Sequence, residues 1–310
     1  MDLSPPPPRW VARPDGRGLL SNLLYTMSSS KYADASAAPL TLLGLEPMRA
    51  VFEFASMHLM NTTSFPPGDG HPVVIFPGLV SDHISTAPLN WFCRGLGYTT
   101  YDWGQGVNTG PQGDLDAWIE ELASHVRDLT SAHRQRISLI GWSLGGIYAR
   151  EVAKKLPRRV RQVITLGTPF GGTVEQNALQ WMHGSSGARK PRSTKDLMAR
   201  LSSAPDVPTT SIFSRSDGVV DWQACLHDGR QEQTEDIEVN SSHFGLGWNP
   251  EVLSIIADRL GQRKRSGPPA AWTRRRTERA TALLLAMAPT REATHLGTPL
   301  QTKPQPVRQR

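Results

Sequence analysis

The stretch SLIGWSLGGIYAR, residues 138–150, places one serine among three glycines, between an apolar β-forming run and a helical pattern. In a strand–turn–helix with the pattern Gly-x-Ser-x-Gly, the tight turn exposes the hydroxyl of Ser143, and Gly141 and Gly145 keep side chains out of crowded positions. The backbone N–H of Leu144, at the helix N-terminus, is expected to point at the same space. A glycine-rich turn with an incidental serine is the competing interpretation.

Strands and helices alternate on both sides of this turn. Short β-branched or apolar runs predict strands in HPVVIFPG (71–78) and at 98–103, 136–141, 161–169, 209–217 and 235–243. Helices are predicted between these strands at 86–97, 114–133 and 144–157, and after the last strand at 249–262. Leu115, Trp118, Leu122, Val126 and Leu129 share one face of the second helix, which makes it the clearest amphipathic segment. The alternation predicts an α/β fold with a mainly parallel central sheet and helices on both faces.

The chain is expected to comprise one α/β domain with extensions at both ends. Residues 1–45 form an N-terminal extension, and residues 1–18 are predicted to be disordered because they are rich in Pro, Arg and Gly. The α/β domain covers 46–262 and opens with a helix at 46–60 that is expected to pack on the body. Residues 171–207 interrupt the alternation and are interpreted as a cap or lid insertion.

A serine nucleophile needs a base, which should be a histidine on a loop after a later strand. His243 fits best among the nine histidines, because it comes at the end of the strand-like EDIEVNS, lies in the loop SSHFGLGWNP and precedes the last helix. His227 is the weaker alternative, since no predicted strand delivers it to the same edge of the sheet. His183 falls in the cap insertion, where a substrate-facing or solvated role is expected.

The acid that orients the imidazole is expected to be Asp217. It stands at the end of the strand TTSIFSRSD and is followed by glycine, at the edge of a parallel sheet where catalytic groups gather. Asp221 is the rival, four residues further on, and a plain Asp-Gly turn is the structural alternative for Asp217. The second oxyanion donor is expected to be the backbone N–H of Leu79, just after Pro77-Gly78.

The order Ser143, Asp217, His243 on βα units resembles that of the α/β-hydrolase superfamily, and most closely its bacterial lipase/esterase-like branch. The resemblance is carried by FPGL (76–79), GYTTYDWGQGVNTGP (97–111), GWSLGG (141–146), LGTPFGG (166–172), SRSDGVV (214–220) and SHFGLGWNP (242–250). It implies a Ser143–His243–Asp217 triad with Leu79 and Leu144 as oxyanion donors. One departure is Pro77-Gly78, where many relatives have His-Gly, so that a supporting polar side chain is lost.

The resemblance implies a serine carboxylic-ester hydrolase that works through an acyl-enzyme without metal or cofactor. An ester with a hydrophobic acyl group is the expected substrate. Substrate contacts are expected from Trp142, Phe170, Trp181, Met182 and Phe244. An acyltransferase on the same triad and a non-catalytic binding protein of the same fold are the alternatives, because the fold alone does not settle the reaction.

Charge is distributed unevenly along the chain. Residues 263–310 hold 11 Lys and Arg against 2 Asp and Glu, whereas the preceding residues carry a net charge of −3. This tail is interpreted as a disordered or weakly helical appendage, with weak contact to anionic membranes as the alternative hypothesis. No nucleic-acid partner is expected. Two cysteines and the lack of a recognisable signal peptide or membrane-spanning run favour a cytoplasmic location.

Overall fold

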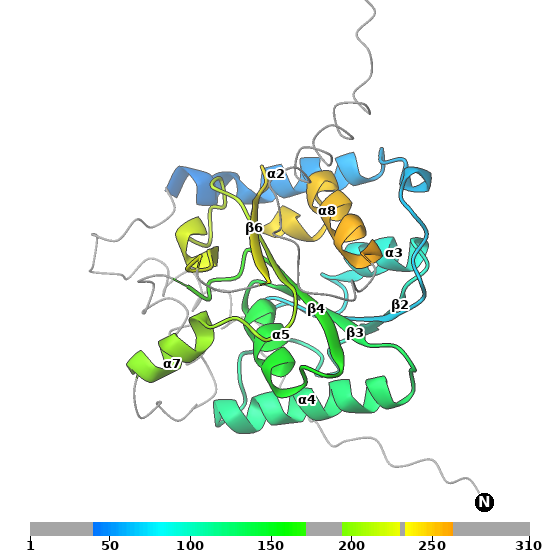
Figure 1. The fold of residues 1–310 in the computed structure, drawn as a ribbon. Coiled ribbons are helices and arrows are strands. Elements are labelled where there is room, and N and C mark those ends of the chain that lie inside the picture. The colour runs from blue at the N-terminus through cyan, green and yellow to red at the C-terminus, as the bar shows by residue number, and fades with distance from the viewer. Residues whose placement is uncertain (1–39, 172–193, 230–232, 263–310) are drawn as a thin grey trace, which may run out of the picture. The chain divides into compact units, whose positions relative to one another are not determined.

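The computed structural model describes residues 40–171, 194–229 and 233–262 (Figure 1). The chain divides into units 1–262 and 263–310, and all described residues belong to the first unit. Among the described helices, none combines the length and the apolar character needed to cross a membrane. Within the same ranges, no cluster of three or more His, Cys, Asp or Glu side chains could hold a metal ion.

Six parallel strands form one sheet in the order β2-β1-β3-β4-β5-β6. The strands are β1 (Pro72–Phe76), β2 (Thr99–Asp102), β3 (Ile137–Trp142), β4 (Val160–Leu166), β5 (Thr209–Phe213) and β6 (Thr234–Glu238). The parallel α/β fold predicted from the alternation is therefore confirmed. Because all strands run the same way, the loops after β3, β5 and β6 meet at one edge of the sheet.

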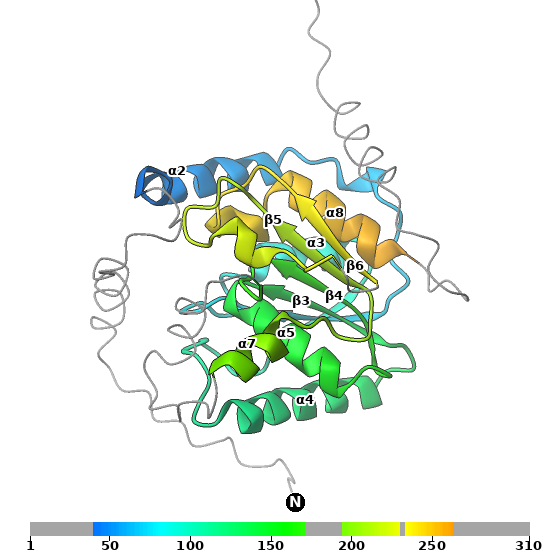
Figure 2. The same ribbon diagram turned by 60° about the vertical axis from the view of Figure 1, so that its left-hand side comes forward.

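Helices cover both faces of the sheet (Figures 1 and 2). The helices are α2 (Leu40–Met57), α3 (Ala87–Gly95), α4 (Leu115–Ser131), α5 (Leu144–Lys155), α7 (Thr194–Ser202) and α8 (Pro250–Gly261), with short 3-10 turns η1 (Thr62–Ser64), η2 (Trp222–Cys225) and η3 (Phe244–Gly247). Alternate strand residues point to opposite faces, so Val73 and Ile75 join the core beneath α3 and α8, while Val74 and Phe76 join the core beneath α4 and α5.

Capping side chains set the starts of two predicted helices. Asp114 accepts hydrogen bonds from the backbone N–H groups of Asp116 and Ala117, and α4 begins at the next residue. Asn249 does the same for α8, where Pro250 takes the first helical position and has no N–H to satisfy. These local signals explain why both helices begin within a residue or two of where the sequence predicts them.

Helix α2 departs from its prediction in extent and in packing. It begins at Leu40, six residues before the expected start at 46, and it ends at Met57 rather than at 60. The helix packs on the body as expected through Met57 and Ala50, but Met48, Val51 and Phe52 are more than half exposed. The buried positions include Glu46, so polar contacts rather than apolar packing attach much of this helix.

The cap insertion expected at 171–207 lies largely outside the described residues, except for its final part. That part contains α7, which lies against α5. The guanidinium of Arg200 donates to the Glu151 carboxylate over 2.6 Å, and Glu151 also accepts from Lys154 over 2.6 Å. The buried carboxylate of Glu151 on α5 therefore fixes the end of the insertion to that helix.

Candidate active site

Ser143 occupies a strained turn between β3 and α5. It is the N-cap of α5 with φ 53° and ψ −123°, a backbone conformation that non-glycine residues rarely adopt. A Cβ at Gly145 would lie 2.4 Å from the Phe76 carbonyl oxygen, and one at Gly141 would lie 2.4 Å from the Cα of Gly146. The glycines flanking Ser143 are therefore required for this close packing of backbone.

Asp217 and His243 form a buried pair at the ends of β5 and β6. Asp217 Oδ2 and His243 Nδ1 are 2.7 Å apart, and both residues are less than 5% exposed. The other oxygen, Oδ1, accepts hydrogen bonds from the N–H groups of Val219 and Val220, each over 2.8 Å. The Asp-Gly turn and the contact with histidine therefore coexist, with one carboxylate oxygen for each.

The surroundings of His243 favour a protonated imidazole. Burial opposes the charged form, but the charge and hydrogen bond of Asp217 outweigh it, and the charge of Glu46 adds to their effect. The pKa of His243 is raised as a result. With Nδ1 donating to Asp217, the neutral ring has its lone pair on Nε2, the nitrogen that can take a proton.

Trp142 links the serine turn to the histidine loop. Its indole N–H donates to the His243 carbonyl over 3.1 Å, and its ring packs on Trp248. Ser143 follows directly and is 6% exposed. No hydrogen bond joins the Ser143 hydroxyl to His243 in the described structure, which is common for catalytic groups without a bound substrate.

The loop after β1 is held by a buried asparagine. Asn108 Nδ2 donates to the Pro77 carbonyl over 2.9 Å, and the Asn108 carbonyl accepts from the Val80 N–H over 2.7 Å. Val80 has a positive φ of 59°, so the chain turns sharply just after Leu79. Within the described residues, the N–H groups of Leu79 and Leu144 donate no hydrogen bond to protein, as an oxyanion hole requires.

The rival residues are engaged elsewhere. His227 lies between Asp236, 2.6 Å from Nδ1, and Arg150, 2.9 Å from Nε2, so both its ring nitrogens are occupied. Asp221 caps η2 by accepting from the Gln223 N–H over 2.9 Å. His183 lies outside the described residues. Geometry therefore favours His243 and Asp217 over these alternatives.

The predicted substrate contacts fall in three different settings. Phe244 is 43% exposed next to His243. Trp142 and Phe170 are buried, and the Phe170 ring packs against the Arg150 guanidinium and the His227 ring, which favours a packing role for Phe170. Trp181 and Met182 lie outside the described residues.

Sequence reasoning missed Asn108 and three residues of α2, namely Glu46, Arg49 and Glu53. Asn108 falls in the segment 97–111 that carries the family resemblance. The sequence signal that could have indicated a turn there is an Asn between two nearby glycines, Gly106 and Gly110. The α2 residues gave no local signal, because their partners lie more than 160 residues further along the chain.

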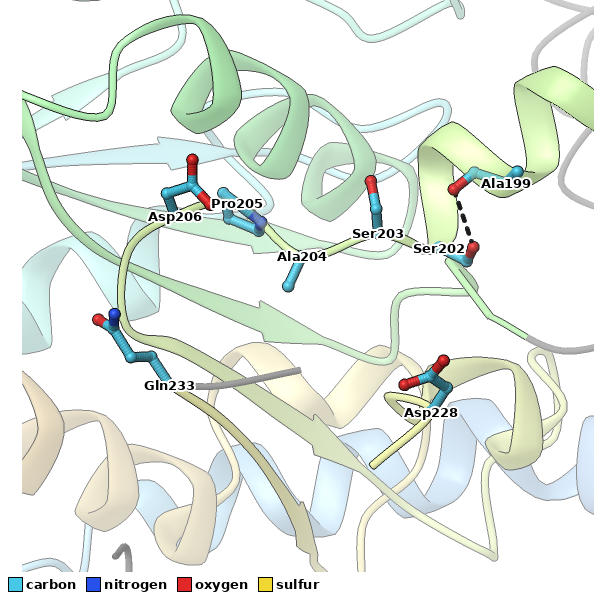
Figure 3. A pocket seen from close by; sticks show the side chains of 8 residues that line it. All are labelled: Ala199, Ser202, Ser203, Ala204, Pro205, Asp206, Asp228 and Gln233. Carbon is cyan, nitrogen blue, oxygen red and sulfur yellow. Dashed lines mark hydrogen bonds between the residues drawn. The ribbon is translucent and has the colours of Figure 1, made fainter. Parts of the chain in front are cut away.

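A hollow of about 470 Å³ lies away from these residues, where α7 ends and β5 and β6 begin (Figure 3). Pro205, Asp228 and Gln233 are among the side chains that line it. Both strands begin there, whereas Asp217 and His243 follow the ends of the same strands. None of the candidate catalytic residues contributes to its wall.

The fold and site define an α/β protein with a sharply turned serine after a central strand and an Asp–His pair on the loops of later strands. The chain belongs to the alpha/beta hydrolase family, whose model matches residues 73–307. The match begins at β1, so α2 precedes it. The resemblance seen in the sequence motifs is confirmed at the level of the family.

Several solved structures resemble the chain. Lipase B from Aspergillus fumigatus is 20% identical, with a TM-score of 0.49 over 66% of this chain and 56% of that one. The Paleococcus ferrophilus monoacylglycerol lipase is 15% identical, with a TM-score of 0.46 over 63% and 96% of the two chains. The Bacillus licheniformis lipase BlEst2 is 17% identical, with a TM-score of 0.47 over 63% and 94%. No match was found among curated proteins.

Proposed function

We propose that the protein is a serine hydrolase of carboxylic esters that uses Ser143, His243 and Asp217 as its catalytic triad. The observation that carries the proposal is the buried Asp217–His243 pair, 2.7 Å apart, at the sheet edge where Ser143 is held at a positive φ. Membership of the alpha/beta hydrolase family supports the same chemistry. The lipases among the similar structures suggest acyl esters as a starting class of substrate.

The residues act in two half-reactions. In the first, Ser143 Oγ attacks the ester carbonyl while His243 Nε2 takes its proton, and Asp217 stabilises the imidazolium. The backbone N–H groups of Leu79 and Leu144 stabilise the oxyanion of the tetrahedral intermediate. His243 then protonates the leaving alcohol as the C–O bond breaks, which leaves an acyl-enzyme.

In the second half-reaction, water replaces the alcohol. His243 takes a proton from water as the resulting hydroxide attacks the acyl carbonyl, and the same amides hold the second oxyanion. Collapse of this intermediate releases the carboxylic acid and returns the proton to Ser143. A hydrophobic acyl group is favoured by the exposed Phe244 beside His243.

Labelling with a fluorophosphonate probe tests the proposal directly. The wild-type chain should be labelled and should cleave p-nitrophenyl esters, whereas Ser143→Ala should lose both properties. His243→Ala should lose nearly all labelling and esterase activity. His227 is a buried histidine of the same domain, and a folded His227→Ala protein should still be labelled. An unlabelled wild type that cleaves neither short-chain nor long-chain esters would refute the proposal.

A further inference from the structure

Helix α2 holds the residues on both sides of Asp217. The Arg49 guanidinium donates to the carbonyl of Ser216 and, over 2.8 Å, to its hydroxyl. The Gly218 N–H donates to Glu46 Oε1 over 2.7 Å. The backbones also meet closely here, since a Cβ on Gly218 would lie 2.6 Å from the carbonyl carbon of Leu42. The acid loop is therefore packed directly against the helix.

The same helix holds the residues on both sides of His243. The Phe244 N–H donates to Glu46 Oε2 over 3.1 Å. The Ser242 N–H donates to Glu53 Oε1 over 2.8 Å, and the Ser242 hydroxyl bonds to the second oxygen of Glu53. The histidine loop thus has two carboxylate contacts, one on each side of the imidazole-bearing residue.

Glu46 is the group that joins the two loops. Its two oxygens accept from different loops, one from Gly218 and one from Phe244, and its side chain is 0% exposed. A buried carboxylate is costly unless hydrogen bonds and opposite charge compensate it. The two amides and Arg49, 3.8 Å from Oε1, supply that compensation. Such a group fixes the spacing of the loops that it bridges.

We propose that Glu46 is a positioning residue for the Asp217–His243 pair and acts by bridging the loops that carry them. The proposal rests on the hydrolase function proposed above. Glu46 lies outside residues 73–307, the part that matches the family model, so this chain completes its site with a helix of its own N-terminal region. The groups of α2 near the pair are the carboxylates of Glu46 and Glu53 and the guanidinium of Arg49.

Glu46→Gln separates positioning from simple folding support. The amide has the same shape, but its NH₂ would face a backbone N–H, so one loop loses its acceptor. We expect kcat for p-nitrophenyl acetate to fall about 10²-fold with little change in KM, because a small misplacement of catalytic groups costs about that much. The NMR titration midpoint of His243 should move to lower pH, because a charge that favours imidazolium is lost.

Glu46→Asp is the second variant. It keeps the negative charge but is one methylene shorter, so it cannot reach both amides. We expect the His243 titration midpoint to stay close to the wild-type value while kcat recovers only in part. Val51→Ala is the matched control, since Val51 lies on the same helix and is 68% exposed. It should leave kcat, KM and the titration unchanged.

Each outcome decides the proposal. A Glu46→Gln protein with lower thermal stability but wild-type kcat and an unchanged His243 titration would overturn it, because the role of Glu46 would then be structural only. If the wild type itself neither hydrolyses esters nor reacts with a fluorophosphonate, the proposed function fails. The histidine titration would still show whether Glu46 acts on His243, so the two failures are distinguishable.

Discussion

Asp217 uses its two carboxylate oxygens for different purposes, and this allows its catalytic role to be tested without unfolding its loop. In Asp217→Asn, the amide oxygen can still accept from Val219 and Val220, while the NH₂ faces the imidazole and forces the wrong tautomer. We expect kcat to fall by about 10⁴, as for such a change in other triads. Asp221→Asn, at the cap of η2, should retain activity.

The same substitution should move the pH profile. In the wild type, kcat/KM should rise with pH as His243 loses its proton, with a midpoint above about 6.5, because the pKa of His243 is raised. Asp217→Asn removes the charge and hydrogen bond that raise this pKa, so the residual activity should titrate at lower pH. A midpoint that does not move would argue against Asp217 as the partner of the base.

Two glycines offer a matched test of the backbone around the serine turn. Gly145→Ala places a Cβ against the Phe76 and Pro77 carbonyls and should lower the free energy of unfolding by about 1–3 kcal/mol. Gly44→Ala, inside α2 and with no atom within 4 Å of the new Cβ, should raise it by about 0.4–1 kcal/mol. Urea unfolding measures the free energy of unfolding of both variants. If the two substitutions changed it by the same amount and in the same direction, the backbone around Gly145 would have shifted to relieve the crowding.

At the level of single residues, the sequence could indicate Ser143, Asp217 and His243 because each has a local signature. Ser143 has flanking glycines, and the other two follow β-forming runs in the order that a parallel sheet brings to one edge. Glu46 has no such signature, since its partners lie 172 and 198 residues away. Its role follows only from tertiary packing.

Hydrogen bonds of Asn108 join its segment to the loop after β1, which carries Leu79, the proposed oxyanion donor. Asn108→Ala should leave the buried Pro77 carbonyl without its partner, at a cost of about 1–3 kcal/mol in unfolding free energy. Displacement of the Leu79 amide should lower kcat by up to about 10²–10³, the loss expected for one oxyanion donor.

Rates of fluorophosphonate labelling and urea unfolding curves measure the two effects of Asn108→Ala separately. Thr109→Ala is the control, because the Thr109 hydroxyl accepts from the exposed amide of Gln112. A stable Asn108→Ala protein that is labelled at the wild-type rate would show that this loop does not depend on Asn108.

Among the elements, the strands and the helices between them are predictable because their apolar residues follow the period of each structure. Helix α2 is different, since its sequence is apolar around most of its circumference and suggests full burial. In the structure it leaves Val51 and Phe52 exposed and is attached by Glu46, Arg49 and Glu53. Hydrophobicity alone cannot show which face of such a helix meets the body.

For the whole domain, another buried histidine, His71, predicts sensitivity to acid. His71, at the start of β1, lies against Asp69, Arg161 and Tyr98, and its Nε2 is 2.8 Å from Ser138 Oγ. Burial is the largest effect and lowers the pKa of His71, although Asp69 acts in the opposite direction. As pH falls below about 6.5, the His71 imidazole therefore takes up a proton in the unfolded chain before it does so in the folded chain. The free energy of unfolding decreases as a result.

Replacing His71 by Gln should make the unfolding free energy less dependent on pH between pH 5 and 7. The raised pKa of His243 has the opposite sign, since its contribution is present below about 6.5 and is lost as pH rises through the folded-state value. The difference between wild type and variant isolates the His71 contribution. Urea unfolding at pH 5 and pH 7 measures it, and parallel pH profiles would contradict the prediction.

The bridge made by Glu46 also sets an order of assembly during synthesis. Helix α2 is synthesised before the sheet, and the Phe244 amide that completes the contacts of Glu46 is made 198 residues after Glu46. At about 5–20 residues per second, the helix waits roughly 10–40 s for that partner. The sheet can begin to form in this interval, whereas the site cannot. Nascent chains released before residue 244 should therefore accumulate folded β1–β4 structure without hydrolytic activity, so activity should require translation past residue 244.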